Sequence, residues 1–498
     1  MDEIELKFGV PGERLEALKR ALGRGAVGRE RLLAAYFDTD DGRLAAAGIA
    51  LRLRREGGRW IQTAKVATED PTRRVEDNVA LAGGRRAALP ALDPARHGDS
   101  AAGAALRRAL ADAGPATLMH RFTVDVRRTT RTVRHQGARI ELALDLGRII
   151  AGGAEEAVCE LEREWKSGPQ APLFSLAERW LAAHGLWLAA ESKAARGARL
   201  AGVTSAAPPA RARTPSLDGV VAPAVLLQRI VASCLEQIVG NAAPLAAGHG
   251  GDEHVHQLRV GIRRLRSALR ELGSLAAGID PAWQPALREA FGALGANRDR
   301  AIVLPRWADE IAAADAPRIA AAGAALDDAP QPQAIVRATA FQRALLGLAA
   351  FCSAPAQPAG GTDDGAAPRR LLAERLARLH RRIARDAKRF AALSGDEQHA
   401  VRKRLKRLRY LSEFAAPLFG KKALGRYLAA MGEAQDALGT LNDERIAEAA
   451  YREQALRDPA AWFGAGWLAA RQLASVVACA SALQRVAKAP RFWARALD

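Results

Sequence analysis

The first two hundred residues alternate between apolar and polar side chains in short runs. The runs are EIELKF (3–8), GIALRLRRE (48–56), RWIQTAKV (59–66), RIELALDLG (139–147) and VCELEREWKSG (158–168). Successive side chains on a β-strand point to opposite faces, so this alternation predicts amphipathic strands. Two stretches with helical spacing, ERLEALKRALG (13–23) and LFSLAERWLAAHG (173–185), lie between the runs. We therefore expect an α+β domain in the first part of the chain.

The pattern changes after a segment rich in Pro, Ala, Ser and Thr, VTSAAPPARARTPSLDG (203–219). This segment has no periodicity and is typical of a linker. Beyond it the alternation disappears, and Ala, Leu and Arg recur at a spacing of three to four residues, which predicts helices. We therefore predict a first domain over 1–202, a linker over 203–219 and an all-α second domain over 220–498.

The helical part contains two pairs of similar segments. HQLRVGIRRLR (256–266) resembles HAVRKRLKRLR (399–409), and ALGANRD (293–299) resembles ALGTLND (437–443) at nearly the same offset. A low-complexity stretch rich in Pro and Gly (353–368) lies between the copies. Two independent matches at one offset indicate an internal duplication, so we predict two related helical bundles.

Composition narrows the possible partners and the compartment. The chain has 498 residues, a formal charge of +19 and a pI of about 10.6, which favours an anionic partner without identifying it. The cysteines lie far apart, at Cys159, Cys234, Cys352 and Cys479. This spacing argues against a disulfide framework or a zinc site. The acidic start is not that of a signal peptide, and no apolar run reaches the length of a membrane span, so we expect a soluble cytoplasmic protein without a membrane partner.

Charged residues occupy one face of each predicted strand, for example Arg52 with Arg54, and Glu160 with Glu162 and Glu164. One such row is most simply a solvated sheet face. Across several strands, however, acids and bases separate into different strands, and the opposite faces are apolar. A closed antiparallel barrel of about eight strands would place all the rows in one lumen. Clustered carboxylates favour hard cations and Arg or Lys favours phosphate, so we predict a phosphate polyanion bound together with divalent metal.

Glu3, Glu5 and Lys7 resemble the ExExK signature of the CYTH family, the triphosphate tunnel metalloenzymes. Further motifs follow in the order of that family: YFDTDDGRL (36–44), LRLRRE (51–56), QTAK (62–65), RVEDN (74–78), IELALDLG (140–147), CELEREWKSG (159–168) and SKAARG (192–197). The resemblance covers roughly residues 1–200. It implies an eight-stranded antiparallel tunnel barrel that hydrolyses or rearranges triphosphates with Mg²⁺ or Mn²⁺.

The resemblance also implies roles for individual residues. The acidic, metal-binding side is implied to be Glu3, Glu5, Asp145, Glu160, Glu162 and Glu164. The phosphate chain is implied to bind Arg52, Arg54, Lys65 and Arg128, with Lys193 and Arg196 closing the tunnel from a helix. The register of Arg128 stays open because Arg127 is adjacent to it. Lys7 and Glu5 are the candidate catalytic residues, with Lys7 orienting or deprotonating the attacking water.

In the helical part, residues spaced by three and four positions form one basic stripe on each of two helices. The stripes are His256, Arg259, Arg263 and Arg266 in the first copy, and His399, Arg402, Lys406 and Arg409 in the second. A solvated face explains one such stripe, but two copies led by His in the same register favour a shared function. They resemble the CHAD domain over roughly 220–498. The resemblance implies a helical domain that binds inorganic polyphosphate and could associate with polyphosphate granules.

These features together predict a metal-dependent inorganic triphosphatase that hydrolyses tripolyphosphate, joined to a polyphosphate-binding domain. A tunnel phosphohydrolase or cyclase acting on thiamine triphosphate or nucleoside triphosphates stays open as an alternative. A non-catalytic protein that binds polyphosphate or nucleic acid is a third reading. The complete acidic and basic set argues against a non-catalytic tunnel. The scarcity of aromatic residues in the basic stripes argues against single-stranded nucleic acid, which usually binds to stacking platforms.

Overall fold

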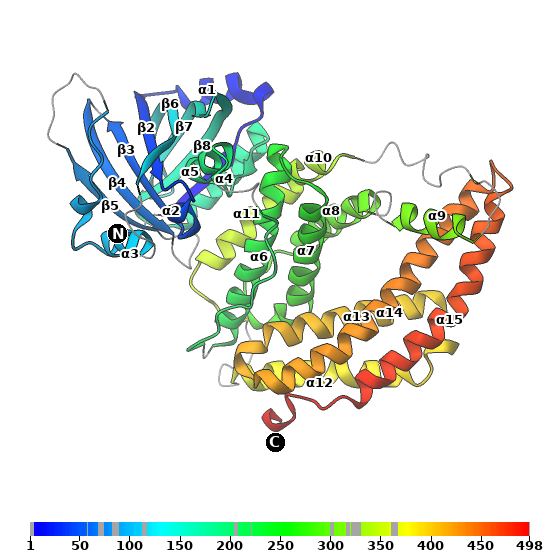
Figure 1. Ribbon diagram of the computed structural model, residues 1–498. Coiled ribbons are helices and arrows are strands. Elements are labelled where there is room, and N and C mark those ends of the chain that lie inside the picture. The colour runs from blue at the N-terminus through cyan, green and yellow to red at the C-terminus, as the bar shows by residue number, and fades with distance from the viewer. Residues whose placement is uncertain are drawn as a thin grey trace. The chain divides into compact units, whose positions relative to one another are not determined.

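The structure, a computed structural model, describes residues 4–56, 58–67, 74–81, 89–111, 117–203, 208–220, 222–298, 303–314, 319, 330–359 and 367–497. The chain divides into two compact units. The first contains residues 1–209, 246–248 and 337–346, and the second contains residues 210–245, 249–336 and 347–498. Figure 1 shows strands in the first unit and helices throughout the second. The antiparallel sheet domain and the helical second part agree with the predicted fold classes, whereas the predicted domain boundaries stay a prediction.

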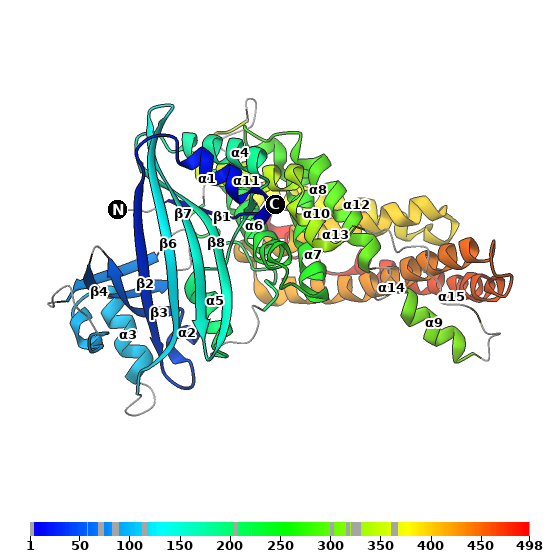
Figure 2. The ribbon, with the colours of Figure 1, turned by 90° about the horizontal axis from the view of Figure 1, so that it is seen from above.

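The first unit is built on an antiparallel sheet of nine strands in the order β5-β4-β3-β2-β6-β7-β8-β1-β9. The strands are β1 (Glu5–Gly9), β2 (Gly28–Asp38), β3 (Ile49–Glu56), β4 (Arg59–Ala67), β5 (Arg74–Ala80), β6 (Met119–His135), β7 (Ala138–Ala151), β8 (Ala154–Ser167) and β9 (Trp187–Leu188). Each alternating run overlaps one of them over its described residues. Figure 2 shows β2, β6, β7 and β8 as long neighbouring strands.

The predicted closure into an eight-stranded barrel is wrong. The strands β5 and β9 are the two edges of the sheet, and among the described residues no pairing joins them. One edge, β9, has only two residues and can offer few hydrogen bonds for closure. Alternation determines which face a side chain occupies, and it is the same in an open sheet and in a closed one. The sequence therefore predicts the faces without determining whether the ends of the sheet meet.

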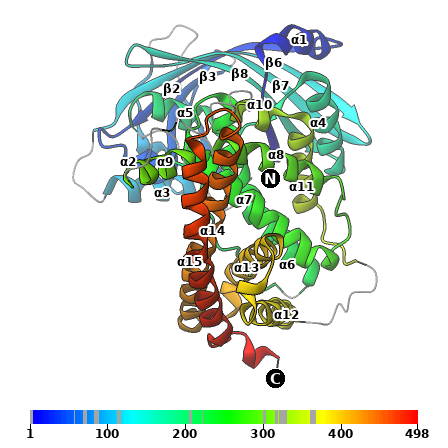
Figure 3. The ribbon, with the colours of Figure 1, turned by 90° about the vertical axis from the view of Figure 1, so that its right-hand side faces the viewer.

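Helices cover both faces of the sheet. They are α1 (Leu15–Leu22), α2 (Arg43–Ala46), α3 (Ala101–Ala111), α4 (Ala171–His184) and α5 (Lys193–Leu200), with the 3₁₀ turns η1 (Gly12–Arg14) and η2 (Pro94–His97). Apolar residues of β3 and β4 pack against α3, and α4 packs against β6, β7 and β8. The other face of β6, β7 and β8 is covered by α5, which lies beneath the arched strands in Figure 3. This short helix faces the charged side of the sheet.

The remaining helices belong to the second unit, apart from residues 246–248 and 337–346, which belong to the first. They are α6 (Pro223–Ala247), α7 (Asp252–Leu272), α8 (Trp283–Arg298), α9 (Leu304–Ala312), α10 (Pro332–Arg337), α11 (Thr339–Ser353), α12 (Pro368–Ala387), α13 (Gly395–Phe414), α14 (Lys421–Gln454) and α15 (Ala461–Lys488), with the 3₁₀ turns η3 (Gly273–Leu275), η6 (Phe390–Ala392), η7 (Ala416–Leu418) and η8 (Ala494–Ala496). The His-led segments lie on α7 and α13, which contact α8 and α14 respectively. Each copy of the repeat is therefore a pair of contacting helices, and the division into two bundles stays a prediction.

Among the described residues, α6 and α15 are long and apolar enough by composition to cross a membrane. The expectation that no segment reaches this length therefore needs correction, since each helix extends across isolated charged residues such as Arg229. The most apolar part of α6 is 61% buried and that of α15 is 22% buried. Core helices of globular domains meet the same criteria, so length and composition alone do not assign a membrane location.

Candidate functional site

Strand pairing places the predicted charged residues on one face of the sheet. Asp145 of β7 lies opposite Arg128 of β6 on one side and opposite Glu160 of β8 on the other. In the same way, Lys7 of β1 lies opposite Glu162 of β8. Directly opposed residues on antiparallel strands point to the same face. The pairing also settles the register of β6, because it places Arg128 on this face.

Three carboxylates of this face converge on one ammonium group. Lys193 Nζ lies 2.8 Å from Asp145 Oδ2, 2.7 Å from Glu160 Oε2 and 2.9 Å from Glu162 Oε1. Arg128 donates hydrogen bonds to both oxygens of Asp145 at 2.7 Å and to Glu162 Oε2 at 2.5 Å. The Asp145 side chain is only 1% exposed, and that of Lys193 is 13% exposed. The result is a buried ion cluster, which we call the acidic cluster and define as Asp145, Glu160 and Glu162.

The charges in this cluster stabilise one another. Burial alone would raise the pKa of Glu162, but the charges of Lys193, Lys7 and Arg128 outweigh it and lower that pKa to about 2. Burial also opposes the charge of Lys193 and Arg128, yet the neighbouring carboxylates raise the pKa of both. Glu162, Lys193 and Arg128 are therefore charged at neutral pH.

A second cation from α5 contacts the cluster. Arg196 Nη1 donates to Glu160 Oε1 at 2.5 Å, and its Nε donates to Glu156 Oε1 at 2.7 Å. The helix can approach the sheet closely because Gly197 has no side chain. A Cβ at Gly197 would lie 2.1 Å from Phe122 Cε2, too close for any van der Waals contact. This glycine therefore fixes the distance from which Lys193 and Arg196 reach the acids.

Basic residues line the same face on the strands beyond β2. Arg52 of β3 donates to the Tyr36 hydroxyl at 3.1 Å, and Lys65 Nζ of β4 lies 3.0 Å from Glu76 Oε2. Arg54 lies two residues along β3 from Arg52, and burial together with the Arg52 charge lowers its pKa. We call Arg52, Arg54 and Lys65 the basic row. On this face the acidic cluster lies on β7 and β8 and the basic row on β3 and β4, whereas β1 carries both Glu5 and Lys7, so the predicted separation of acids and bases holds only in part.

The N-terminal strand lies at the side of the acidic cluster. Lys7 Nζ lies 3.6 Å from Glu5 Oε1 and 3.7 Å from Glu162 Oε1, distances that allow ion pairing without a short hydrogen bond. Glu3 lies outside the described residues. Of the ExExK residues, Glu5 and Lys7 are thus placed beside the cluster.

The site can be compared with the needs of a divalent metal ion. Among the described residues, no group of three or more His, Cys, Asp or Glu side chains is arranged to hold a metal as the structure stands. The acidic cluster surrounds Lys193 instead, and Glu164 pairs with Lys166 at 2.6 Å. The donor atoms of the acidic cluster are carboxylate oxygens, which hard cations prefer. Glu160 Oε2 is buried and has no hydrogen-bond partner, although Lys193 Nζ lies 2.7 Å away. In donor chemistry the cluster fits Mg²⁺ or Mn²⁺.

In the helical unit, the first basic stripe lies against α8. The guanidinium carbons of Arg259 and Arg263 lie 4.6 and 5.7 Å from the centre of the Phe291 ring. A Cβ at Gly295 would lie 2.6 Å from Arg259 Nη1, so the glycine of the ALGANRD segment makes room for this side chain. Burial and the charges of neighbouring arginines lower the pKa of Arg266. His256, at the head of the stripe, is half-buried.

The second stripe lies against α14. Arg409 Nη1 donates to Gln435 Oε1 at 2.6 Å, and its Nε donates to Glu413 Oε1 at 2.8 Å. Burial, followed by the charges of Lys403 and Arg402, lowers the pKa of His399. The remaining predicted residues of this stripe, Arg402 and Lys406, are half-buried.

The helical unit has a further basic surface that was not predicted from the sequence. It consists of Arg375, Arg378, Arg382 and Arg385 on α12 with Arg404 and Arg407 on α13. Burial and then the charges of Arg382 and Arg385 lower the pKa of Arg404. The spacing of the α12 arginines, by three and four residues, is the signal that could have identified this surface.

Residues 1–198 match the CYTH domain, and residues 229–452 match the CHAD domain. The chain is a CYTH–CHAD protein. The ion cluster and the basic row lie within the CYTH match, and both His-led stripes lie within the CHAD match. The recognition made from the ExExK and His-led motifs is confirmed.

Individual relatives match parts of this CYTH–CHAD protein. The inorganic triphosphatase of Haemophilus influenzae (strain ATCC 51907 / DSM 11121 / KW20 / Rd) is 40% identical over 81 residues, which span 16% of this chain and 23% of that relative. The crystal structure of the CHAD domain from Ricinus communis is 28% identical, with a TM-score of 0.41, and covers 57% of this chain and 98% of its own. The structure of HpAC1 from Hippeastrum, which is described as an adenylyl cyclase with a dominant triphosphatase activity, is 17% identical, with a TM-score of 0.27. The match covers 40% of this chain and 96% of HpAC1.

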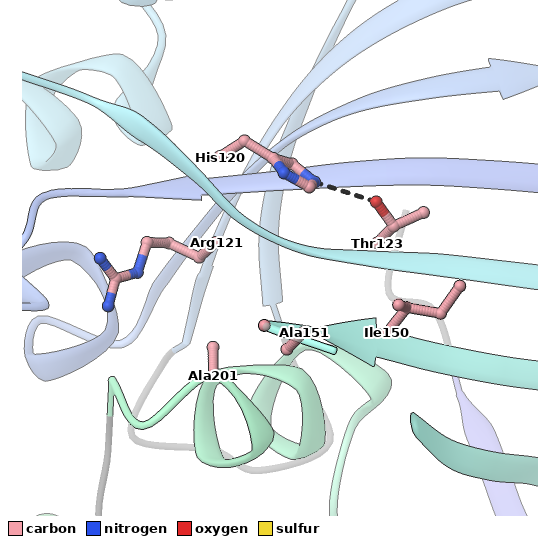
Figure 4. Close-up of a pocket in the computed structure, with 7 residues that line it drawn as sticks. His120, Arg121, Thr123, Ile150, Ala151 and Ala201 are labelled. Atoms are coloured by element: carbon pink, nitrogen blue, oxygen red, sulfur yellow. Dashed lines mark hydrogen bonds between the residues drawn. The ribbon is translucent and has the colours of Figure 1, made fainter. Parts of the chain in front are cut away.

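The CYTH domain also has a pocket away from the ion cluster, with a volume of about 450 Å³. Figure 4 shows it at the ends of β6 and β7, beside the end of α5. Its lining is His120, Arg121, Thr123, Ile150, Ala151, Gly152 and Ala201. His120 Nε2 lies 2.9 Å from Thr123 Oγ1, and Arg121 Nη1 donates to Asp40 Oδ1 at 3.2 Å. The acidic cluster contributes nothing to this lining, so the pocket and the charged site are separate features.

Sequence reasoning also missed a buried arginine behind the acidic cluster. Arg163 lies between Glu162 and Glu164 in sequence and therefore points to the opposite face of β8. Its guanidinium carbon lies 4.8 Å from the centre of the Phe8 ring and 5.2 Å from that of Trp180, and its nitrogens have no hydrogen-bond partner. Complete burial lowers the pKa of Arg163 to about 9. An arginine on the apolar side of an alternating run is the signal in the sequence.

Proposed function

We propose that this CYTH–CHAD protein is a divalent-metal-dependent inorganic triphosphatase that hydrolyses tripolyphosphate, and that its CHAD domain binds inorganic polyphosphate. The observation that carries the proposal is the presence of the acidic cluster and the basic row on one face of the CYTH sheet. Clustered carboxylates repel one another and are stabilised by cations, whereas the basic row attracts an anion. A triphosphate bound with metal meets both requirements. The inorganic triphosphatase of H. influenzae supports the reaction class.

The basic row is the proposed binding surface for the phosphate chain. Arg52 and Arg54 can each present two N–H groups to phosphate oxygens, whereas Lys65 contributes a single compact charge. Arg52 and Lys65 both contact Glu76, at 3.8 and 3.0 Å, so one carboxylate orients two of these cations. Arg128 and Arg196 lie on the acidic side and would bind the phosphate nearest the cluster.

Asp145, Glu160 and Glu162 are the proposed ligands of Mg²⁺ or Mn²⁺, and the predicted Glu3, Glu5 and Glu164 are further candidates. A bound divalent cation supplies charge neutralisation at the phosphate oxygens and lowers the pKa of water. The other roles are filled by residues of the protein. Lys7, which lies between Glu5 and Glu162, orients the attacking water. Arg128 and Lys193 offset the charge that develops on the phosphate oxygens.

The CHAD domain is the proposed site for long polyphosphate. Its two His-led stripes and the α12–α13 arginines present cations at intervals along helices, which suits an anion with one charge per phosphate. Arg259 and Arg263 lie over the Phe291 ring, which supports their side chains on this side of α7. We propose that this domain keeps the enzyme near cytoplasmic polyphosphate granules.

The test compares phosphate release from tripolyphosphate, long polyphosphate, ATP and thiamine triphosphate, with Mg²⁺ or Mn²⁺ in each case. We expect tripolyphosphate to be hydrolysed fastest, and Glu5→Gln to lower its turnover. Glu16→Gln, which removes an exposed carboxylate on α1, is the matched control and should keep full activity. Faster turnover of ATP or thiamine triphosphate would favour the alternative substrates. No phosphate release from any substrate would favour the non-catalytic reading.

A further inference from the structure

Lys193 occupies the centre of the acidic cluster, where its ammonium group is within 2.9 Å of three carboxylates. No other cation of the described site lies this close to all three acids. If Lys193 served only to bind phosphate, its ammonium group would be expected to lie near the basic row. Here it fills the position in which a carboxylate cluster would otherwise require a bound cation.

The cluster is electrically balanced as it stands. Its three carboxylates contact Lys193, Arg128 and Arg196, and the flanking Lys7 and Glu156 add one charge of each sign. Both oxygens of Asp145 and both oxygens of Glu162 contact a cation. A divalent cation added to this arrangement would bring an excess of positive charge into a buried site. Such an excess is costly, so one of the present cations has to leave before a metal can bind.

The three cations differ in how firmly they are held. Arg128 makes a bidentate contact with Asp145, and Arg196 also donates to the Ala157 carbonyl oxygen at 2.5 Å. Lys193 donates to Glu162 Oε1 and lies 2.8 Å from Asp145 Oδ2, but its approach to Glu160 Oε2 lacks hydrogen-bond geometry. A lysine side chain is also flexible along four carbons, and Lys193 is the first residue of α5. Lys193 is therefore the cation that can leave.

We propose that Lys193 is a built-in counter-ion that competes with the divalent metal for Asp145, Glu160 and Glu162, and that it moves to the phosphate chain when metal and triphosphate bind together. The identity of the anion rests on the proposed function, whereas the competition between Lys193 and metal does not. The exchange makes metal binding and triphosphate binding interdependent. Each ligand alone leaves a charge uncompensated, and the two together restore the balance.

The first experiment measures Mn²⁺ binding to metal-free full-length protein, without any phosphate compound, by electron paramagnetic resonance. We expect Lys193→Met to bind Mn²⁺ about tenfold more tightly than wild type, because the competing charge is gone. Lys193→Arg keeps the charge and should bind as weakly as wild type. Lys19→Met is the matched control: it removes one positive charge from exposed α1, so it reports any effect of net charge alone. Equal Mn²⁺ affinity in Lys193→Met and wild type would overturn the proposal.

A second measurement uses unaltered protein, so it does not depend on the folding of a variant. The rate at which an amine-specific reagent modifies Lys193 is followed by mass spectrometry. We expect this rate to rise when Mn²⁺ is added alone and to fall again with Mn²⁺ and a non-hydrolysable triphosphate analogue. A rate unchanged by saturating Mn²⁺ would contradict the exchange. Tripolyphosphate hydrolysis without these effects would refute only the counter-ion role, and the effects without hydrolysis would refute only the triphosphatase assignment.

Discussion

The CYTH sheet and the CHAD helices both present arginine and lysine, but they hold these cations in opposite ways. In the sheet, Lys193 and Arg128 are buried against carboxylates, and the charges balance before any ligand arrives. In the helices, Arg259 and Arg263 stack on the Phe291 ring, and other arginines lie close enough to lower the pKa of their neighbours. The helices also contain ion pairs, such as Arg404 with Asp386 and Arg407 with Glu271, but their arginines and lysines outnumber their acids, whereas the cluster in the sheet is compensated internally.

The difference indicates what each region can bind. A balanced cluster binds a single ion only weakly, but it can exchange its internal ion pairs for a metal cation and a phosphate anion that bind together. A region with excess positive charge gains from any flexible polyanion, and it should lose that gain as salt screens the interaction. The same residue types therefore support chemistry in one region and retention in the other.

The largest effect should come from removing one carboxylate of the acidic cluster. Glu162→Gln takes away a carboxylate that contacts Lys193, Lys7 and Arg128, and leaves one positive charge of the site uncompensated. We expect tripolyphosphate turnover to fall by roughly 100- to 1,000-fold, the loss associated with removal of one preorganised electrostatic group. The measurement is phosphate release with Mg²⁺, and polyphosphate retention on a filter should be unchanged.

The matched control for that variant is Glu155→Gln, an exposed carboxylate on the same strand that pairs with Arg148. It should keep turnover within about twofold of wild type, in line with the small worth of an exposed ion pair. If Glu155→Gln lost as much activity as Glu162→Gln, the effect would reflect β8 as a whole and not the acidic cluster.

The complementary change reverses two positive charges in the CHAD domain, where cations outnumber acids. Replacing Arg259 and Arg402 by Glu in one protein should weaken polyphosphate binding by about 100-fold, because each reversal removes an attraction and adds a repulsion. Tripolyphosphate turnover should stay at the wild-type level. Binding is measured by retention of labelled polyphosphate at several salt concentrations.

Its control reverses two exposed arginines that pair within their own helices, Arg306 on α9 and Arg370 on α12. This variant has the same net charge as the Arg259 and Arg402 variant. Equal loss of binding in both would show that total charge, and not the His-led stripes, governs retention.

In the sheet, the sequence predicts which face each side chain occupies, but it does not predict whether the sheet closes into a barrel. The alternation around Glu162 and Arg52 determines which side chains share a face, because period-two spacing follows from strand geometry alone. Closure depends on strand lengths and on distant pairing, such as the two-residue β9, for which no local pattern exists. The direction in which Lys193 points was also beyond reach. Sequence places it on a helix near phosphate-binding motifs, whereas its contacts depend on how closely Gly197 lets α5 approach the sheet.

In the helical region, the His-led stripes could be predicted because their spacing repeats in two copies. The arginines of α12 show the same spacing, yet a single copy offers nothing to separate it from a solvated face. The aromatic support of the first stripe was unpredictable for another reason. Phe291 lies on a different helix from Arg259, so only tertiary packing brings them together. Repetition therefore revealed the stripes, and the structure revealed what supports them.

A smaller effect should appear in acid. The pKa of Glu162 falls from its ordinary value of 4.5 to about 2 in the folded protein, so its ionised form stabilises the fold. This contribution is complete above about pH 4.5 and is lost as the pH falls towards 2. We therefore expect the free energy of unfolding, from urea titrations followed by circular dichroism, to fall more steeply between pH 5 and 2 for wild type than for Glu162→Gln. Glu155→Gln should follow wild type; parallel curves for all three proteins would contradict the cluster's role in stability.

The smallest effect should come from the aromatic support of the first stripe. Phe291→Leu keeps an apolar side chain of similar bulk but removes the ring over which Arg259 and Arg263 lie. A cation–π contact at a partly exposed site is worth about 0.5–1 kcal/mol, so polyphosphate affinity should fall by about two- to fivefold. Because the number of cations is unchanged, the slope of affinity against salt concentration should match that of wild type. A changed slope would mean that Phe291 determines how many cations reach the ligand; an unchanged slope with weaker binding would mean that the ring preorganises cations whose charge does the binding.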